Sequence, residues 1–180
     1  MPSMFRPLVA ASIVLAAMPL GTLSAQATAT AGPMNVAKVT IATGPDRGTY
    51  NMEVPRLNED QMGTCRIRPR RDAAGSVVAA SFYPPMEGNP GLMEAVTTFN
   101  VGSGGKTTEV NVVVTFLVGQ RPNLDMRAYE VETRPYQTAK GRGSATFTRR
   151  GSTATARVEA ETAEGVKITM EIQCNALTEE

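Results

Sequence analysis

The sequence lacks histidine and tryptophan altogether, and these absences exclude several kinds of site. Without histidine there is no Ser-His-Asp triad, no Cys-His nucleophilic pair and no histidine-ligated metal. Aromatic residues are few, whereas sugar-binding sites usually contain aromatic platforms. We therefore predict a non-enzymatic protein that has no cofactor and no bound metal.

An excess of charge of either sign is also missing. The chain carries 18 Lys and Arg against 17 Asp and Glu, and Arg6 is the one charged residue before Thr28. The remainder of the chain is therefore balanced in charge. Because proteins that bind nucleic acid usually carry a basic excess, we expect no nucleic-acid partner.

Long hydrophobic runs are missing as well. Residues 8–18 form an uncharged apolar run that follows Arg6 and precedes a series of small residues. This order is typical of a secretory signal peptide, whereas a membrane-spanning helix needs about 20 apolar residues. We predict a signal peptide over residues 1–27, with cleavage after Ala27 or alternatively after Ala25. The mature protein is then periplasmic or extracellular and has no transmembrane segment.

Cysteine is scarce, since the chain contains Cys65 and Cys174 and no other. In an oxidising compartment, two cysteines predict one disulfide. A catalytic thiol is the alternative, but the chain has no histidine to serve as its base. The bridge would close a loop of about a hundred residues, for which chain entropy predicts about 4.7 kcal/mol of stabilisation.

Alternation of apolar and polar residues with a period of two is the dominant pattern of the mature chain. Turn sequences rich in glycine and proline separate about nine such segments at intervals of about 8 to 12 residues. The pattern predicts an all-β, antiparallel β-sandwich, with a barrel as the alternative. We expect a flexible lead over residues 28–34 and a single domain over 35–176. Cys65 and Cys174 both fall on the inward side of their predicted strands, which favours the disulfide.

Two segments depart from this simple pattern. Residues 108–118 carry apolar side chains on both faces, including Val113 and Leu117, which predicts a central strand buried on both sides. Residues 55–63 are polar and predict a loop, with one helical turn at 57–61.

Arginines alternate along one predicted strand, at Arg66, Arg68 and Arg70, and Arg71 follows them. An exposed row of arginines suits an anionic partner such as lipid head groups, lipopolysaccharide phosphates or an acidic polymer. The alternative is that the row pairs with carboxylates across strands, and the balanced net charge favours it. The carboxylates considered for this pairing are Glu159, Glu161 and Glu171.

A second basic group lies in a predicted loop, where contacts with partners are common. It consists of Arg134, Lys140 and Arg142.

Carboxylates offer the remaining route to catalysis, because glycoside hydrolysis needs two of them. The candidates are Glu53, Glu59, Asp60, Glu87 and Glu94. We interpret each of them as solvated surface. The local cluster of Asn58, Glu59 and Asp60 lacks the spacing of a calcium loop.

The C-terminal third runs from Gly141 through Phe147 and a turn to Thr162 and Gly165, and it ends in a strand that finishes at Cys174. This pattern resembles the lipoprotein-antigen family of mycobacteria, in which an early cysteine and one at the end of the last strand are expected to bridge. The resemblance implies a β-sandwich with a role in the cell envelope and no established catalytic residues. The chain lacks the lipidated N-terminal cysteine of that family, so membrane anchoring does not carry over.

The features together predict a binding or structural module of the cell envelope. Its ligand is a lipid, an envelope polymer or a protein. A carboxylate-dependent polysaccharide hydrolase or lyase is one alternative. A subunit of an extracellular assembly joined through sheet edges is another.

Overall fold

The computed structural model describes residues 34–54, 63–70, 74–84, 91–120, 123–135 and 138–180. The predicted signal peptide, most of the predicted lead and the predicted helical turn at 57–61 lie outside these ranges. The described residues form strands joined by turns. Among them, no helix is long and apolar enough to cross a membrane.

Five antiparallel strands form the first sheet, in the order β2-β1-β10-β9-β8. Their bounds are Asn35–Ile41 for β1, Gly48–Val54 for β2, Arg142–Arg150 for β8, Thr153–Glu161 for β9 and Lys167–Cys174 for β10. The pairing of β1 with β10 brings the first and the last third of the chain together.

Six strands form the second sheet, in the order β11-β3-β4-β5-β6-β7. Their bounds are Gly63–Pro69 for β3, Ser76–Phe82 for β4, Leu92–Val101 for β5, Thr107–Gln120 for β6, Asn123–Glu132 for β7 and Leu177–Glu179 for β11. All neighbours are antiparallel except β11, which runs parallel to β3. β11 was not predicted, because three residues are too few to show a period.

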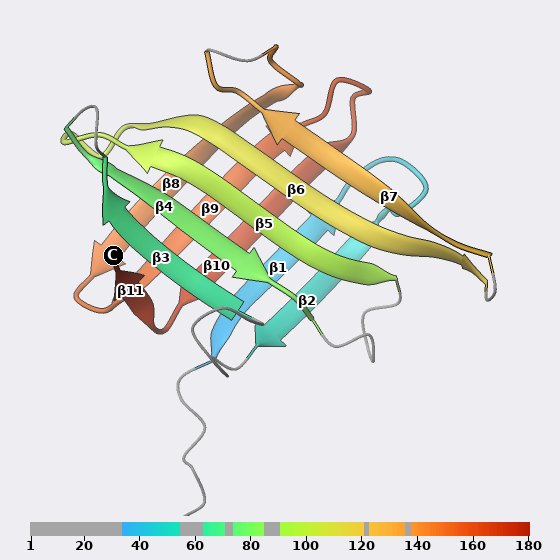
Figure 1. Cartoon of the computed structure of the whole chain (residues 1–180), viewed down its shortest axis with the longest axis horizontal. Coiled ribbons are helices and arrows are strands. Elements are labelled where there is room, and N and C mark those ends of the chain that lie inside the picture. Colours follow the sequence, from blue (N-terminus) through green and yellow to red (C-terminus); the bar gives the residue numbers. More distant parts are fainter. Residues whose placement is uncertain (1–33, 55–62, 71–73, 85–90, 121–122, 136–137) are drawn as a thin grey trace, which may run out of the picture.

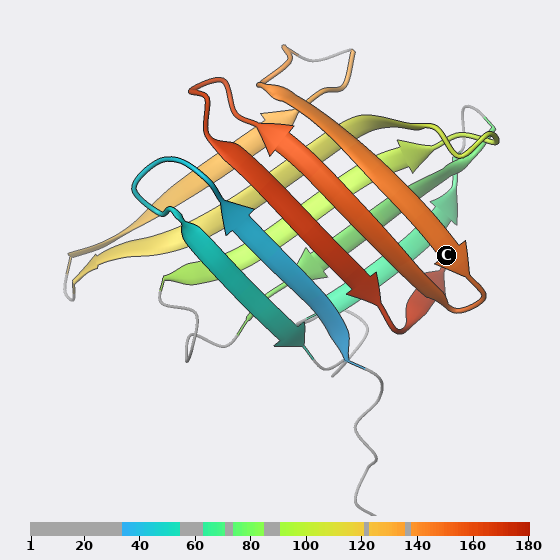
Figure 2. The ribbon, with the colours of Figure 1, turned by 180° about the vertical axis from the view of Figure 1, so that it is seen from behind.

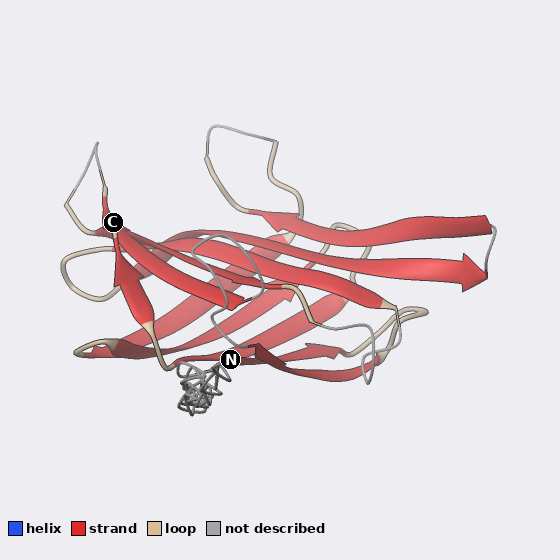
Figure 3. Ribbon diagram, turned by 60° about the horizontal axis from the view of Figure 1, so that its bottom comes forward, coloured by secondary structure: helices blue, strands red, loops and turns tan. Residues whose placement is uncertain are grey.

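The two sheets pack face to face as a sandwich, and their strands run across one another (Figure 1 and Figure 2). The prediction of an all-β sandwich is thereby confirmed, with eleven strands in place of about nine. The hairpin of β6 and β7 extends past the end of the five-stranded sheet (Figure 3). The inner face of this far end is therefore not covered by the five-stranded sheet, and residues 123–126 are exposed.

The core lies between the sheets and follows the alternation of the sequence. In β9 and β10 every second residue is buried, so one face of each strand contacts the other layer while the other face meets solvent. The largest fully buried side chains include Phe82, Phe99, Phe116, Met52 and Met170. These side chains lie between the two sheets.

The prediction that residues 108–118 are buried on both faces is wrong for one of them. β6 has neighbours on both sides, and Val110, Val112 and Val114 are buried between the layers. Val113 and Leu117 lie on the outer face, where they are half-buried. None of the described residues forms a layer over this face, and β-branched and long side chains shield each other there across neighbouring strands.

A disulfide joins Cys65 of β3 to Cys174 of β10, with Cα atoms 5.8 Å apart. The chain leaves the five-stranded sheet directly after Cys174 and enters the other as β11, whose Leu177 is the register partner of Cys65. The fully buried Asn35 supports this corner: its amide nitrogen donates to the Gly63 carbonyl, and its oxygen accepts from the backbone N–H groups of Asn175 and Ala176. The predicted disulfide is confirmed and lies where the chain changes sheets.

Candidate functional site

The predicted arginine row lies on the outer face of the six-stranded sheet. Arg66 and Arg68 alternate with the inward Cys65 and Ile67 on β3, and Arg70 follows the end of the strand. Arg71 lies outside the described residues. Ala79 and Thr98 are small neighbours on β4 and β5, so Arg66 and Arg68 border a shallow trough of about 210 Å³.

The members of the row have different surroundings. The Arg66 guanidinium lies 2.9 Å from the Glu180 carboxylate, and that of Arg70 lies 3.8 Å from Glu109. Arg68 is exposed and has no ion-pair or hydrogen-bond partner within the part of the chain that the structure describes. Arg68 is therefore the member of the row that a ligand would meet unpaired.

The predicted partners of the row, Glu159, Glu161 and Glu171, do not pair with it. All three lie on β9 or β10, on the outer face of the other sheet. There Arg157 bonds Glu159 and Glu171, while Arg142 bonds Glu161. The prediction of these partners was wrong because the alternation shows whether a residue points inward or outward, but it does not show to which sheet the strand belongs.

The second basic group is fully engaged in ion pairs. Arg134 bonds Glu132, Lys140 bonds Glu130 and Arg142 bonds Glu161, at 2.6, 2.9 and 2.7 Å. Each carboxylate lies on β7 or β9, so these pairs hold the connection between the sheets against the strands beside it. Arg134 and Lys140 consequently have a structural role, whereas Arg142 also borders the depression described next.

The carboxylates considered for hydrolysis do not come together among the residues that the structure describes. Glu53 is exposed on β2, and Glu94 on β5 accepts a hydrogen bond from Thr115 at 2.8 Å. Glu59, Asp60 and Glu87 lie outside the described residues. No group of three or more Asp, Glu or Cys that would suit a metal ion occurs in the described ranges.

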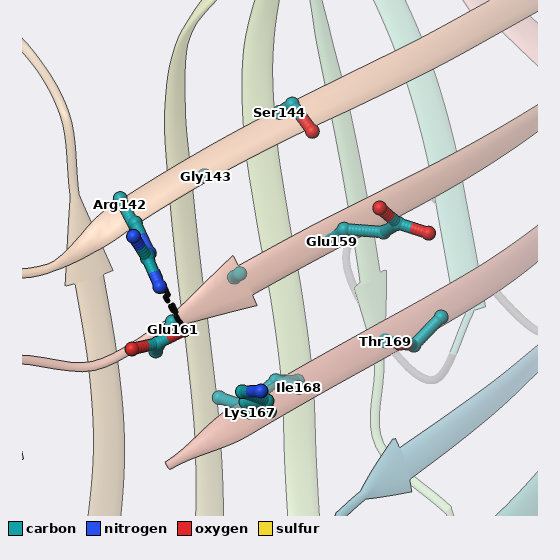
Figure 4. A pocket seen from close by; sticks show the side chains of 9 residues that line it. Arg142, Gly143, Ser144, Glu159, Glu161, Lys167, Ile168 and Thr169 are labelled. Atoms are coloured by element: carbon teal, nitrogen blue, oxygen red, sulfur yellow. Dashed lines mark hydrogen bonds and ion pairs between the residues drawn. The ribbon is translucent and has the colours of Figure 1, made fainter. Parts of the chain in front are cut away.

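A depression of about 470 Å³ lies on the outer face of the five-stranded sheet, over β8, β9 and β10 (Figure 4). Its side chains form two rows that the strand register lines up across the sheet. The first row is Arg142, Glu161 and Lys167, and the second is Ser144, Glu159 and Thr169. Gly143 and Ala160 lie between the rows and belong to the inward sets of their strands, so the backbone forms the floor of the depression at this point.

The second row combines short hydroxyl side chains with a carboxylate. Ser144 and Thr169 flank Glu159, and their hydroxyl groups have no hydrogen-bond partner in the described part of the chain. Glu159 accepts from Arg157 Nε at 3.0 Å, which leaves its other oxygen open. The Lys167 ammonium group at the end of the first row is also without an ion-pair partner among the described residues. The depression thus presents donors and acceptors that are not used internally.

The charges in the depression balance. Its two cations, Arg142 and Lys167, flank Glu161, and its second carboxylate, Glu159, lies between two hydroxyl groups. The hydrogen bond from Arg142 holds the pKa of the Glu161 carboxyl below its usual value, and the same bond raises the pKa of Arg142. Glu161 is therefore ionised at neutral pH and acts as a hydrogen-bond acceptor.

Sequence reasoning missed this depression. Ser144, Glu159 and Thr169 are outward residues of three separate alternating strands, and each by itself has the appearance of ordinary solvated surface. No local signal marks these residues, because they come together through the register of β8, β9 and β10.

No family model, no curated protein and no solved structure matches this chain.

Proposed function

We propose that the protein is an exported, non-enzymatic binding module of the cell envelope, and that the depression over β8, β9 and β10 holds a polar segment of an envelope polymer. The observation that carries the proposal is the row of Ser144, Glu159 and Thr169, whose hydroxyl groups have no partner among the described residues. The depression falls within the range of about 300 to 1,000 Å³ that ligand sites usually occupy.

Both signs of charge in the depression fit a polymer that carries hydroxyl groups together with amino or carboxyl groups. The large apolar side chains buried between the sheets favour such a surface ligand over a lipid held inside the sandwich. The predicted signal peptide supports export. The disulfide is consistent with it, because disulfides persist in oxidising compartments.

Co-sedimentation of the chain from Thr28 onward with purified peptidoglycan sacculi tests the proposal. We expect the wild type to sediment with the sacculi, and the double variant Glu159→Ala/Lys167→Ala to bind about tenfold more weakly. The matched control is Thr49→Ala/Asn51→Ala, which removes two exposed side chains from β2 on the same face.

Vesicles of anionic phospholipid serve as the second probe. Sacculus binding that survives Glu159→Ala/Lys167→Ala contradicts the proposal. Binding to vesicles that is lost with Arg68→Ala would assign the ligand to the arginine row, and the depression would then not be the site.

A further inference from the structure

Among the residues that the structure describes, β7 is the edge strand of the six-stranded sheet, and its only neighbour on the open side is Lys140, which bridges Glu132. Leu124 and Met126 on this strand are two of the four large hydrophobic side chains that are markedly exposed among the described residues, at 41% and 65%. They lie on the outer face near the turn between β6 and β7. The other sheet does not cover this end of the hairpin (Figure 3). An edge strand with apolar side chains is a template for pairing with another strand.

The last residue of β7 shows which backbone groups of this strand point away from β6, toward the open edge. The N–H and C=O of Glu132 bond Lys140 rather than β6. The register between β6 and β7 has no shift, and an antiparallel strand alternates the direction of its backbone groups from residue to residue. The N–H and C=O groups of Leu124, Met126, Ala128 and Glu130 therefore point to the open edge. The Met126 N–H is bonded to the side chain of its neighbour Asp125 at 2.8 Å.

We infer that β7 pairs with β7 of a second copy of this chain, antiparallel and about a two-fold axis at Met126. In this register Met126 faces Met126 of the second copy, and Leu124 faces Ala128. All three residues direct their backbone groups to the edge, so each opposed pair forms two hydrogen bonds. The two six-stranded sheets become one continuous sheet.

Charge complementarity fixes this register. On the inner face, Asp125 lies opposite Arg127 of the second copy, and the symmetry repeats the pair. Arg127 bonds Asp46 through one nitrogen, which leaves its other donors for Asp125 of the second copy. The Met126 N–H turns to its opposed carbonyl, which releases the Asp125 carboxylate for this contact.

Neighbouring registers fit less well. An axis at Asp125 or at Arg127 sets like charges against each other and opposes residues whose backbone groups point to β6. An axis at Ala128 requires Leu124 to face Glu132, where Lys140 already occupies the edge. The depression on the five-stranded sheet lies on the other layer, so the pairing is independent of the proposed ligand.

Sedimentation equilibrium of the chain from Thr28 onward, over a series of concentrations, tests the pairing. We expect a twofold increase in mass toward high concentration for the wild type. Met126→Lys opposes two ammonium groups at the axis and leaves a single-protomer mass throughout. The matched control Asn51→Lys adds the same charge to the edge strand β2 and dimerises as the wild type does.

Cysteine cross-linking tests the register itself. Met126→Cys sets two thiols on opposed residues about 5.5 Å apart at Cα, which suits a disulfide. Ala128→Cys sets them about 14 Å apart along the strands. We expect mild oxidation to cross-link the first variant into a dimer and not the second. A single-protomer mass of the wild type at every concentration, dimerisation of Met126→Lys, or equal cross-linking of Ala128→Cys would each overturn the inference.

Discussion

The carboxylate of Asp46, in the turn between β1 and β2, accepts a hydrogen bond of 2.7 Å from the hydroxyl of Tyr129 on β7. This contact ties the turn of one sheet to a strand of the other. Arg127 donates to both oxygens of the same carboxylate, and the Tyr129 ring packs edge-on against Phe116. Burial raises the pKa of Tyr129, and the hydrogen bond to Asp46 raises it further, so its hydroxyl stays protonated and donates.

Replacing Asp46 should loosen the contact between the layers. Asp46→Ala leaves the nearly buried Tyr129 hydroxyl without its acceptor, which costs about 2 kcal/mol of the free energy of unfolding. Urea denaturation measures the loss. Glu53→Ala removes an exposed carboxylate of β2 and should change the midpoint little. Equal midpoints for the two variants would contradict the structural role of Asp46.

Glu132 should make stability depend on pH. It is largely buried, and hydrogen bonds from Arg134 hold the pKa of its carboxyl below the usual value of 4.5. Since the folded pKa lies below the unfolded one, this carboxylate stabilises the fold fully above about pH 4.5, and the contribution is lost as the pH falls through the folded pKa.

Glu132→Gln should therefore lower stability at neutral pH and flatten its decline in acid. Thermal unfolding at neutral pH and at pH values below 4.5 checks this difference. Glu53→Gln is the control, because it makes the same change at an exposed position of β2. A parallel decline for wild type and Glu132→Gln would show that other groups govern acid unfolding.

The disulfide between Cys65 and Cys174 should contribute strongly to stability. It closes a loop with a sequence separation of 109 residues, for which chain entropy predicts that loss of the bridge costs about 4.7 kcal/mol. The double variant Cys65→Ala/Cys174→Ala, compared with the wild type in urea, measures this effect. Reductant should lower the midpoint of the wild type and leave that of the variant unmoved. A midpoint of the variant equal to that of the oxidised wild type would contradict the expectation.

Gly141 should tolerate no side chain, because a Cβ there would lie 2.1 Å from the carbonyl oxygen of Glu161. Gly105 is a matched control: its φ is +76° against +81° for Gly141, but nothing lies within 4 Å of its added Cβ. Gly105→Ala should cost about 1 kcal/mol for the left-handed backbone alone. Gly141→Ala should cost at least 2 kcal/mol more, about the range of overpacking. Equal losses in urea denaturation would remove the close approach as the cause.

Part of the architecture could be predicted because it depends on the period of the sequence. The alternation in β9 and β10 predicts which of their residues face the core, and the alternation in β3 and β10 places Cys65 and Cys174 inward. The failure at Val113 and Leu117 has a physical reason. Apolar residues on the second face of β6 indicate partial shielding by neighbouring strands, and they do not require a covering layer.

The candidate site could not be predicted in the same way. Ser144, Glu159 and Thr169 form a row through the register of three strands, and Arg66 was expected to pair with carboxylates that proved to lie on the opposite layer. The Asp46 and Tyr129 contact likewise joins residues 83 positions apart.

The sequence by itself determined most of the strands, most of their inward faces, the bridged cysteines and the absence of histidine chemistry. These properties depend on residue type and on a local period of two, which is present within each strand and does not depend on its neighbours. Tertiary structure alone decided the sheet to which each strand belongs, the residues that line the depression and the edge that β7 leaves open. Those properties depend on pairings such as that of β1 with β10, which are set by the packing of the whole chain.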